Sequence, residues 1–281
     1  MKIPFRVDLS KEVVAITGGG GVLMSAFAEV LAACGAKVAV LDYNEEAAKK
    51  VAQDLNEKGY TALAVAVNCL DKQSLIDAER TIESKLGTVT TLINGAGGNN
   101  PKCTTDNEVM QKNLDPEVKS FFDLDEGGFR FVFDINILTA VLCSQVFAKG
   151  MIENGGGNII NISSMNAFRP LTKIPAYSAA KAGVSNLTQW LAVHFAPCNI
   201  RVNAIAPGFF VSNQNRSLLF KDDGTPSDRA NKILSHTPMQ RFGETEDLIG
   251  TLLWLSDGNA SGFVTGIVVP VDGGFSSYSG V

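Results

Sequence analysis

Short apolar runs alternate with helix-length segments along the whole chain, and this alternation constrains the fold more than any other feature. Amphipathic segments such as 22–35 and 44–59 separate the runs. Apolar strands that alternate with helices indicate a parallel sheet covered on both faces. We therefore predict an α/β fold: one doubly wound domain spanning 1–281, with a parallel seven-stranded sheet and helices on both faces. The runs expected to form its strands are 13–17, 37–42, 62–67, 91–94, 158–163, 200–205 and 266–271.

Two long polar excursions interrupt this rhythm, at 98–127 and 209–240. Long insertions inside compact domains are usually functional loops or lids. Each excursion follows the carboxyl end of a predicted strand, which is the side where open α/β sheets bind ligands. We expect both to be substrate loops.

Composition narrows the classes of function. The chain has 24 basic and 29 acidic residues, a net charge of −5, which disfavours nucleic acid and anionic membranes as partners. No apolar run near 20 residues and no signal peptide are expected. Five scattered cysteines suggest reduced thiols and a cytoplasmic location. Because His194 and His236 are the only histidines, we expect no metal site and no Ser-His-Asp hydrolase.

A glycine-rich turn joins the first predicted strand to the first helix, in the sequence TGGGG at 17–21. Glycines in such a turn let backbone N–H groups approach a pyrophosphate at a helix N-terminus. Asp42 ends the second predicted strand, where a carboxylate binds ribose hydroxyls and repels a 2′-phosphate. A plain turn at 17–21 and a capping role for Asp42 are the alternatives, although Asn44 is better placed to cap the next helix. These features favour NAD(H) over NADP(H).

Tyr177 and Lys181 stand four residues apart in YSAAK, on a predicted helix. The ammonium would lie beside the phenol and lower its pKa towards the range of a general acid or base. Ser164 closes the fifth predicted strand, so its hydroxyl would face the same cleft unless it is only a turn residue. Asn136 lies on a predicted helix, where Asn is a poor helix former and needs another reason to be present.

These motifs, in this order and together with NGAG (94–97), NAIAPG (203–208) and TGIVVPVDGG (265–274), resemble the short-chain dehydrogenase/reductase family over essentially the whole chain. The resemblance implies a Rossmann fold and NAD-dependent chemistry on CH–OH groups. It implies that Tyr177 exchanges the substrate proton and that Lys181 binds the nicotinamide ribose. Ser164 would bond the reacting oxygen, and Asn136 would hold a water. The implied cofactor-binding residues are Gly18, Gly21, Val22, Leu23, Asp42, Asn68, Cys69, Asn94, Gly95, Ala96, Tyr177, Lys181, Pro207, Gly208, Phe210 and Ser212.

The chain departs from the family pattern at three places. Val22 and Met24 replace the two later glycines of the cofactor loop, and we expect them to crowd the helix N-terminus. Gly95 stands where asparagine is commoner, which removes one side-chain hydrogen bond. Ser212 replaces a threonine and keeps the hydroxyl. The four catalytic positions are intact.

The loops around the site resemble the sugar-acid branch of the family, in particular D-mannonate oxidoreductases, also called fructuronate reductases. An anionic substrate of a net acidic chain needs local positive charge, which Lys102, Arg169, Lys173 and Arg216 would supply. Arg169 is the favoured partner of the carboxylate, because an Arg can hold a carboxylate through two parallel hydrogen bonds. The expected substrate residues are Asn99, Lys102, Met165, Arg169, Asn213 and Arg216.

Other functions stay open at this point. Gluconate-type and other polyol dehydrogenases fit the same motifs, and an acyl or lipid carbonyl reductase would need a more apolar rim. A catalytically silent NAD-binding scaffold is the alternative from another class, since fold does not imply function. The last strand and the C-terminal GGFSSYSGV resemble family segments that pack across tetramer interfaces, so a homotetramer is expected by analogy.

Overall fold

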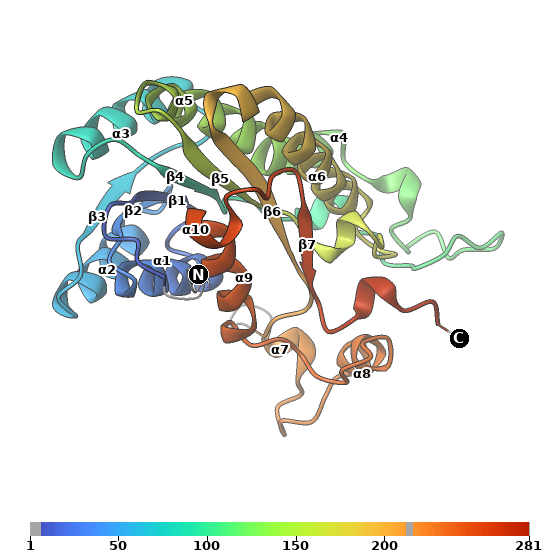
Figure 1. Cartoon of the computed structure of the whole chain (residues 1–281). Helices are drawn as coiled ribbons and strands as arrows, with labels where there is room; N and C mark the ends of the chain where they lie inside the picture. The colour runs from blue at the N-terminus through green and yellow to red at the C-terminus, as the bar shows by residue number, and fades with distance from the viewer. Residues whose placement is uncertain (1–6, 212–215, 281) are drawn as a thin grey trace.

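A central parallel sheet organises the chain, as the computed structural model of residues 7–211 and 216–280 shows (Figure 1). Its seven strands lie in the order β3-β2-β1-β4-β5-β6-β7, and every pairing is parallel. The predicted fold is confirmed. The strands are β1 (Val13–Thr17), β2 (Lys37–Asp42), β3 (Ala62–Ala66), β4 (Thr91–Asn94), β5 (Gly157–Ile162), β6 (Ile200–Pro207) and β7 (Val268–Val271).

Helices cover both faces of the sheet because successive residues of the inner strands point to opposite sides. In β1, Val13 and Ala15 join one hydrophobic core, whereas Val14 and Ile16 join the other. The first core is closed by α3 (Lys72–Lys85), α5 (Thr139–Glu153) and α6 (Pro175–Phe195). The second is closed by α1 (Val22–Ala33), α2 (Glu45–Glu57) and α9 (Glu246–Ser256).

The ends of several elements differ from the prediction by one or two residues. β5 begins and ends one residue earlier than expected, and β6 continues to Pro207. Asn44 caps α2 as predicted: its side chain accepts a hydrogen bond of 3.2 Å from the Ala47 N–H. After α2, Gly59 has a φ of +85°, in the left-handed region that glycine adopts without strain.

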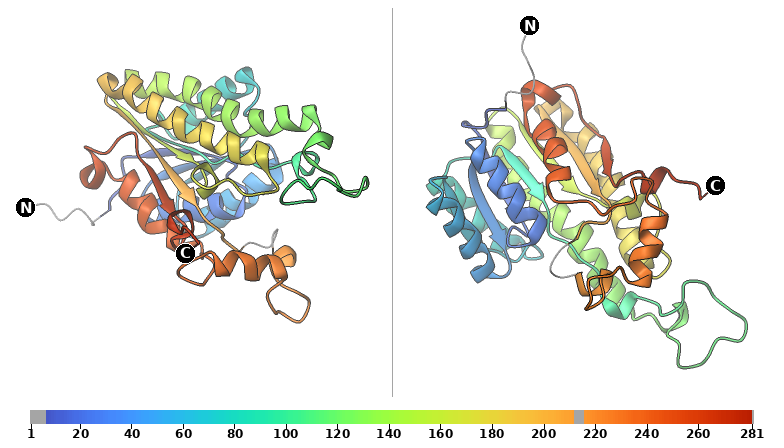
Figure 2. Two further views of the ribbon diagram at one scale, coloured as in Figure 1. Left: turned by 90° about the vertical axis from the view of Figure 1, so that its right-hand side faces the viewer. Right: turned by 90° about the horizontal axis from the view of Figure 1, so that it is seen from below.

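The two excursions are partly ordered into short helices. The first contains η1 (Pro101–Cys103), η2 (Phe121–Asp123) and the start of α4 (Glu126–Phe133), and its middle part projects away from the body (Figure 2). The second contains α7 (Arg216–Leu219) and α8 (Asp228–Ser235). It carries a small hydrophobic cluster of its own, separate from both sheet cores. The remaining short helix, α10 (Gly258–Ser261), follows α9.

The expectation that no apolar run approaches the length of a membrane span is wrong. The continuous helical run Glu126–Glu153, formed by α4, a π-helical turn and α5, is apolar and long enough to span a bilayer, with a mean hydropathy of 1.8 in its best 18-residue window. Half of that window is buried in the protein. α5 packs on the sheet beside α3, and most of its buried residues belong to the first core. The high hydropathy thus accompanies the packing of a core helix.

Candidate active site

The four predicted catalytic residues meet beyond the carboxyl ends of β4 and β5. Ser164 follows β5, Tyr177 and Lys181 lie on α6, and Asn136 lies in the π-helical turn before α5. Gly97, in the loop after β4, joins two of them: a Cβ built on this residue would lie 2.6 Å from Asn136 Oδ1 and 3.2 Å from Lys181 Nζ. The loop after β4 therefore packs directly on the catalytic side chains.

Tyr177 is half-buried, and this environment disfavours its ionised form. Burial raises the pKa of the phenol, and the neighbouring Ser164 hydroxyl lowers it by less. Ser164 Oγ also accepts a 3.3 Å hydrogen bond from the Asn166 N–H and caps η4 (Met165–Ala167). The serine hydroxyl is thereby fixed beside the tyrosine by the backbone of the loop that follows it.

Lys181 is 4% exposed, and its Nζ donates a 2.8 Å hydrogen bond to the Ile162 carbonyl at the end of β5. Burial lowers the pKa of Lys181 to about 8. Its Nζ lies 5.6 Å from the centroid of the Tyr177 ring. The expectation that Lys181 lowers the tyrosine pKa is therefore wrong for this structure. The ammonium is directed at a backbone carbonyl, and burial of the phenol dominates.

The side-chain hydrogen bonds of Asn136 account for the presence of an asparagine in this helical segment. In the π-helical turn Asp134–Leu138 the backbone N–H groups bond one residue further back than in an α-helix. The side-chain nitrogen Nδ2 of Asn136 donates to the Val132 carbonyl, four residues earlier, at 2.7 Å. It also donates to the Gly98 carbonyl at 2.7 Å, and Oδ1 accepts from the Gly98 N–H at 3.3 Å. Asn136 thus fixes the first residues of the excursion at the site.

The glycine-rich turn forms a close-packed cradle at the end of β1. Gly18 has a φ of +66°, and a Cβ on it would lie 3.1 Å from the backbone of Ala96. The Gly20 N–H donates to Asp42 Oδ2 at 3.0 Å, and a Cβ on Gly20 would lie 2.6 Å from Ala47 Cβ. A glycine turn at the N-terminus of α1, with a carboxylate acceptor at the end of β2, is the arrangement in which a dinucleotide binds. These residues fit NAD.

Met24 and Gly95 are packed against each other. Met24 is buried, and a Cβ on Gly95 would lie 2.2 Å from its sulfur and 2.7 Å from the Thr17 carbonyl oxygen. The Met24 side chain therefore packs against Gly95, and the absence of a side chain at Gly95 leaves room for it. Val22 is 40% exposed. Thr17 Oγ1 accepts from the N–H groups of Gly95 and Ala96 at 3.1 and 3.2 Å.

Other expected cofactor residues lie at or after the carboxyl ends of strands, but the side chains of several are hydrogen-bonded or buried within the protein. Asn94 Nδ2 donates to Asn161 Oδ1 at 2.8 Å and to Ser144 Oγ at 3.3 Å, inside the core. Asn68 Oδ1 accepts from the Leu70 N–H, and Cys69 is buried. Gly21 and Leu23 border the start of α1. The residues Pro207, Gly208 and Phe210 follow one another at the end of β6, and Ser212 lies outside the described residues.

The expected substrate residues are dispersed around the excursions. Met165 is buried directly after Ser164, whereas Arg169 is exposed and bonds to the Phe168 carbonyl at 3.5 Å. Lys102 is exposed on η1, and Asn99 bonds to Thr104. Arg216 is exposed, with its guanidinium 5.3 Å from the centroid of the Phe220 ring. Asn213 lies outside the described residues. Among the residues described, no hydrogen bond or ion pair joins these groups.

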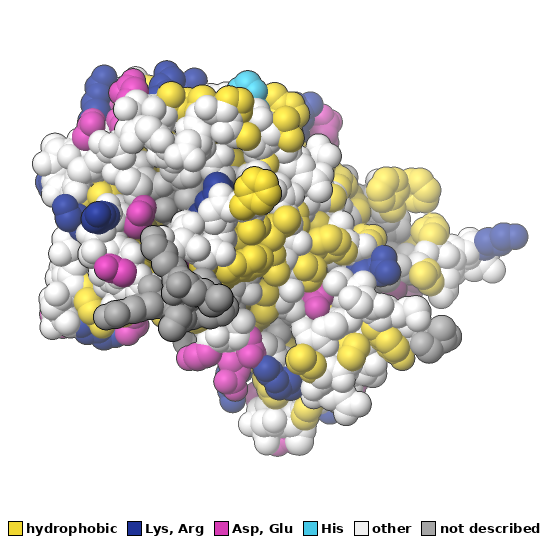
Figure 3. Space-filling view, viewed as in Figure 1, with side chains coloured by type: hydrophobic (Ala, Val, Ile, Leu, Met, Phe, Trp, Pro, Cys, Tyr) yellow, Lys and Arg dark blue, Asp and Glu magenta, His cyan; other side chains and the backbone are white. Residues whose placement is uncertain are grey.

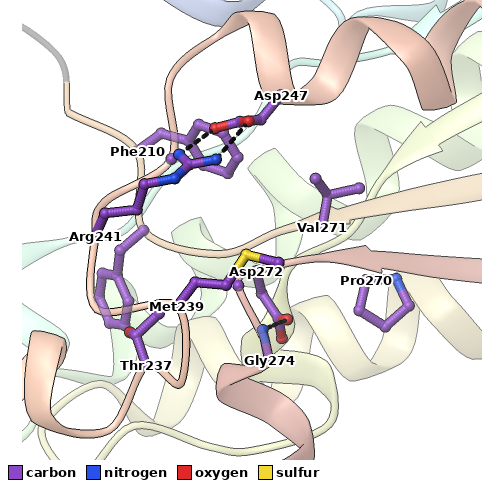
Figure 4. A pocket seen from close by; sticks show the side chains of 12 residues that line it. Phe210, Thr237, Met239, Arg241, Asp247, Pro270, Val271, Asp272 and Gly274 are labelled. Atoms are coloured by element: carbon purple, nitrogen blue, oxygen red, sulfur yellow. Dashed lines mark hydrogen bonds and ion pairs between the residues drawn. The ribbon is translucent and has the colours of Figure 1, made fainter.

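A cavity of about 350 Å³ lies near the ends of β6 and β7 (Figure 4). The sequence did not indicate it, and none of the four catalytic candidates lines it. In its wall, Arg241 holds Asp247 through bonds of 2.6 and 2.8 Å and lowers the pKa of that carboxyl to about 2. The sequence interpretation also missed Gly97 as a packing position, although its place in NGAG was the available signal.

All five cysteines lie in the described part of the chain as free thiols. Cys103 is buried next to the site, in a small cluster that includes Val132, Ala176 and Tyr177. This cluster anchors η1, the base of the first excursion, against α4 and α6. The excursion therefore begins at the site even though its middle part projects away.

Comparisons with known proteins identify relatives over the full length. A model of the short chain dehydrogenase family matches residues 12–222. A solved structure from Haemophilus influenza, described as a candidate D-mannonate oxidoreductase with bound NAD, is 58% identical, with a TM-score of 0.94 and 98% of each chain covered. The oxidoreductase UxuB of Bacillus subtilis, itself uncharacterized, is 53% identical over 99% of this chain and 100% of its own length. The 7α-hydroxysteroid dehydrogenase of Escherichia coli is 33% identical over 92% of each chain.

The family match, the sheet order and the clustered Ser164, Tyr177 and Lys181 agree with one another. The chain belongs to the short-chain dehydrogenase family and is an oxidoreductase of the kind that acts on CH–OH groups.

Proposed function

We propose that the protein interconverts a ketone and a secondary alcohol on a sugar acid with NAD(H), and that the pair is D-fructuronate and D-mannonate. The observation that carries the proposal is the 58% identity to the NAD-containing candidate D-mannonate oxidoreductase. The intact Asn136, Ser164, Tyr177 and Lys181 support an active enzyme rather than a silent scaffold.

NADH, when bound, supplies the hydride for reduction of the ketone. The protein's own residues transfer the proton. Tyr177 holds its proton at neutral pH, as an ordinary phenol does, and burial raises the pKa of this phenol further. It donates this proton to the carbonyl oxygen as that oxygen becomes an alkoxide, and it accepts a proton in the reverse direction. Ser164 donates a hydrogen bond to the same oxygen and stabilises its developing charge.

Lys181 and Asn136 position the reacting groups. The Lys181 ammonium, anchored to the Ile162 carbonyl, provides positive charge beside the phenol and a donor for the nicotinamide ribose. Asn136 holds the backbone of Gly98 and thereby the loop after β4. The water expected at Asn136 would have to bind beside an amide that already makes three hydrogen bonds to backbone.

We propose NAD(H) in preference to NADP(H). The glycine turn at 18–21 would let the pyrophosphate approach the N-terminus of α1, and Asp42 would accept hydrogen bonds from the adenosine ribose. The Asp42 carboxylate is already oriented by the N–H groups of Gly20 and Asn44, at 3.0 and 2.9 Å. The turn at 17–21 contains no basic residue, so a 2′-phosphate would face this fixed negative charge, which is unfavourable.

The carboxylate of the substrate would be held by Arg169, five residues after Ser164. Its guanidinium is exposed and makes one long contact, so most of its donors are available. Lys102, Lys173 and Arg216 would add positive charge at the rim. Lys232 and, to a smaller extent, Lys173 lower the pKa of Glu108, so the positive charge of Lys173 is partly offset by this carboxylate.

A panel of ketones assayed by NADH absorbance tests the proposed substrate. D-fructuronate, other sugar acids, neutral ketoses, apolar ketones and a 7-oxo bile acid should be compared by kcat/KM. Arg169→Met should raise KM for the acid by about tenfold or more, since a hydrogen bond to a charged group contributes about 1.5–3 kcal/mol. The control Arg80→Met, on α3, should leave KM unchanged. Preference of the wild type for neutral or apolar ketones over every sugar acid would contradict the proposal.

Assembly as a homotetramer and a cytoplasmic location also remain proposals. Hydrophobic side chains gather over β7 on the face that Figure 3 shows. This strand is an edge of the sheet and is only partly buried. An apolar edge strand is a favourable surface for pairing with another copy. Light scattering after size exclusion would give the assembly directly, and a monomer would contradict this proposal.

A further inference from the structure

The chain continues beyond β7 as a strap, residues 272–278, that touches the parts bordering the active site. Its short helix η6 (Phe275–Ser277) packs beside η4, the turn that follows Ser164. Figure 1 shows this segment running from the end of β7 towards α8. Within its own chain, this segment contacts η4, the loop after β6 and the end of α8.

The start of the strap is rigidly built. The Asp272 carboxylate accepts hydrogen bonds from the N–H groups of Gly274 and Ser276, at 2.9 and 2.8 Å. Gly273 and Gly274 have φ values of +63° and +90°, and a Cβ on Gly274 would lie 3.0 Å from Pro238. The Gly273 carbonyl also accepts from the Met239 N–H at 3.1 Å. The turn is thus fixed against the segment that follows α8.

Two aromatic contacts extend this attachment. The Phe275 ring meets the Phe209 ring edge to face, with centroids 5.2 Å apart. Phe209 belongs to the loop after β6, beside Gly208. The Tyr278 ring meets the His236 ring, at the end of α8, with centroids 6.3 Å apart. The strap therefore connects η4, the loop after β6 and α8.

The contacts of the strap are among those that attach the lobe formed by α7 and α8 to the rest of the protein. Its own hydrophobic cluster, centred on Leu219, Ala230 and Ile233, is separate from the two sheet cores. The cavity of about 350 Å³ lies beside this attachment and is lined by the loop after β6, the α8–α9 connection and the first residues of the strap (Figure 4). A segment with few buried contacts to the body opens readily unless something holds it.

We propose that the strap sets the affinity for substrate by holding the α7–α8 lobe against the catalytic side, with Phe275 as the positioning residue. The proposal rests on the proposed function only for the ketone used in the assay. An edge-to-face aromatic pair changes an equilibrium by up to about tenfold. Losing it should populate a displaced lobe and weaken substrate binding, while the cradle at β1 and β2 stays intact.

Phe275→Ala tests the proposal. KM for the ketone that turns over fastest should rise about five- to tenfold, while kcat and the Kd of NADH stay within about twofold. Phe275→Leu should recover most of the affinity, and Tyr278→Ala, at an exposed position, should raise KM less. Phe263→Ala is the matched control, because its ring is fully exposed before β7. Amide hydrogen exchange of 228–240 should quicken in Phe275→Ala and not in the control.

Two results would overturn the proposal. One is a KM and an exchange rate for Phe275→Ala equal to those of the Phe263→Ala control. The other is a parallel loss of NADH affinity and thermal stability, which would mark Phe275 as a general packing residue. If no ketone turns over with the wild type, the proposed function fails, and the exchange measurement still decides whether the strap holds the lobe.

Discussion

Gly97 is the position where one added methyl group would most directly disturb the active site. A Cβ at this residue would lie 2.6 Å from Asn136 Oδ1 and 3.2 Å from Lys181 Nζ. Neither neighbour can move freely. The Asn136 amide makes three hydrogen bonds to the backbone of Gly98 and Val132, and Lys181 Nζ is bonded to the Ile162 carbonyl.

Gly97→Ala should therefore displace Asn136 or the loop after β4. Overpacking of this kind costs about 1–3 kcal/mol, and each broken hydrogen bond about 1 kcal/mol more. A shift of about 1 Å in a catalytic group can lower the rate by about 100-fold. We expect urea unfolding to show a loss of about 2–4 kcal/mol and steady-state assays to show kcat reduced about 10- to 100-fold.

The neighbouring residue provides the control. A Cβ on Gly98 would have nothing within 4 Å, and its backbone bonds to Asn136 would survive the substitution. Gly98→Ala should therefore retain both stability and kcat. Wild-type stability and turnover in Gly97→Ala, or equal losses in the two variants, would refute the packing argument.

Three further predictions concern the charged and hydroxyl groups of the site. The folded pKa of Lys181, about 8, lies below its ordinary 10.5, so the unfolded chain binds more protons between these values. In urea titrations, the unfolding free energy of the wild type should rise from pH 8 to 10.5 by about 3 kcal/mol more than that of Lys181→Met. Equal pH slopes would contradict burial of the charge. Asp42→Ser should reduce the NADH-to-NADPH ratio of kcat/KM about tenfold or more; an unchanged ratio would exclude Asp42 as the discriminating group. Ser164→Ala should lower kcat about 100-fold with little change in the Kd of NADH, and a wild-type kcat would remove it from catalysis.

The sequence predicted the fold well because hydrophobic periodicity determines strands that are buried on both faces. All seven strands were placed to within two residues, since runs such as 13–17 have few alternative structures. Asn44 was identifiable as a cap because capping depends on neighbouring residues only.

The sequence was less informative about features of the site that depend on packing between residues distant in the sequence. The contact of Met24 with Gly95 joins α1 to the loop after β4, and no local pattern indicates it. The pKa of Tyr177 depends on burial, which spacing on a helix does not give, so the expected lowering by Lys181 was wrong. The π-helical turn at Asn136 was visible only as a poor helix former within a helix.

Turnover by Tyr177→Phe is the measurement that tests the account most directly. The variant removes only the hydroxyl that we propose donates and accepts the substrate proton. With D-fructuronate and NADH, kcat should fall by about 100-fold or more, while NADH binding, measured by fluorescence titration, stays within about twofold of the wild type. Turnover near the wild-type rate would contradict the assignment of Tyr177 as the acid and base of the reaction.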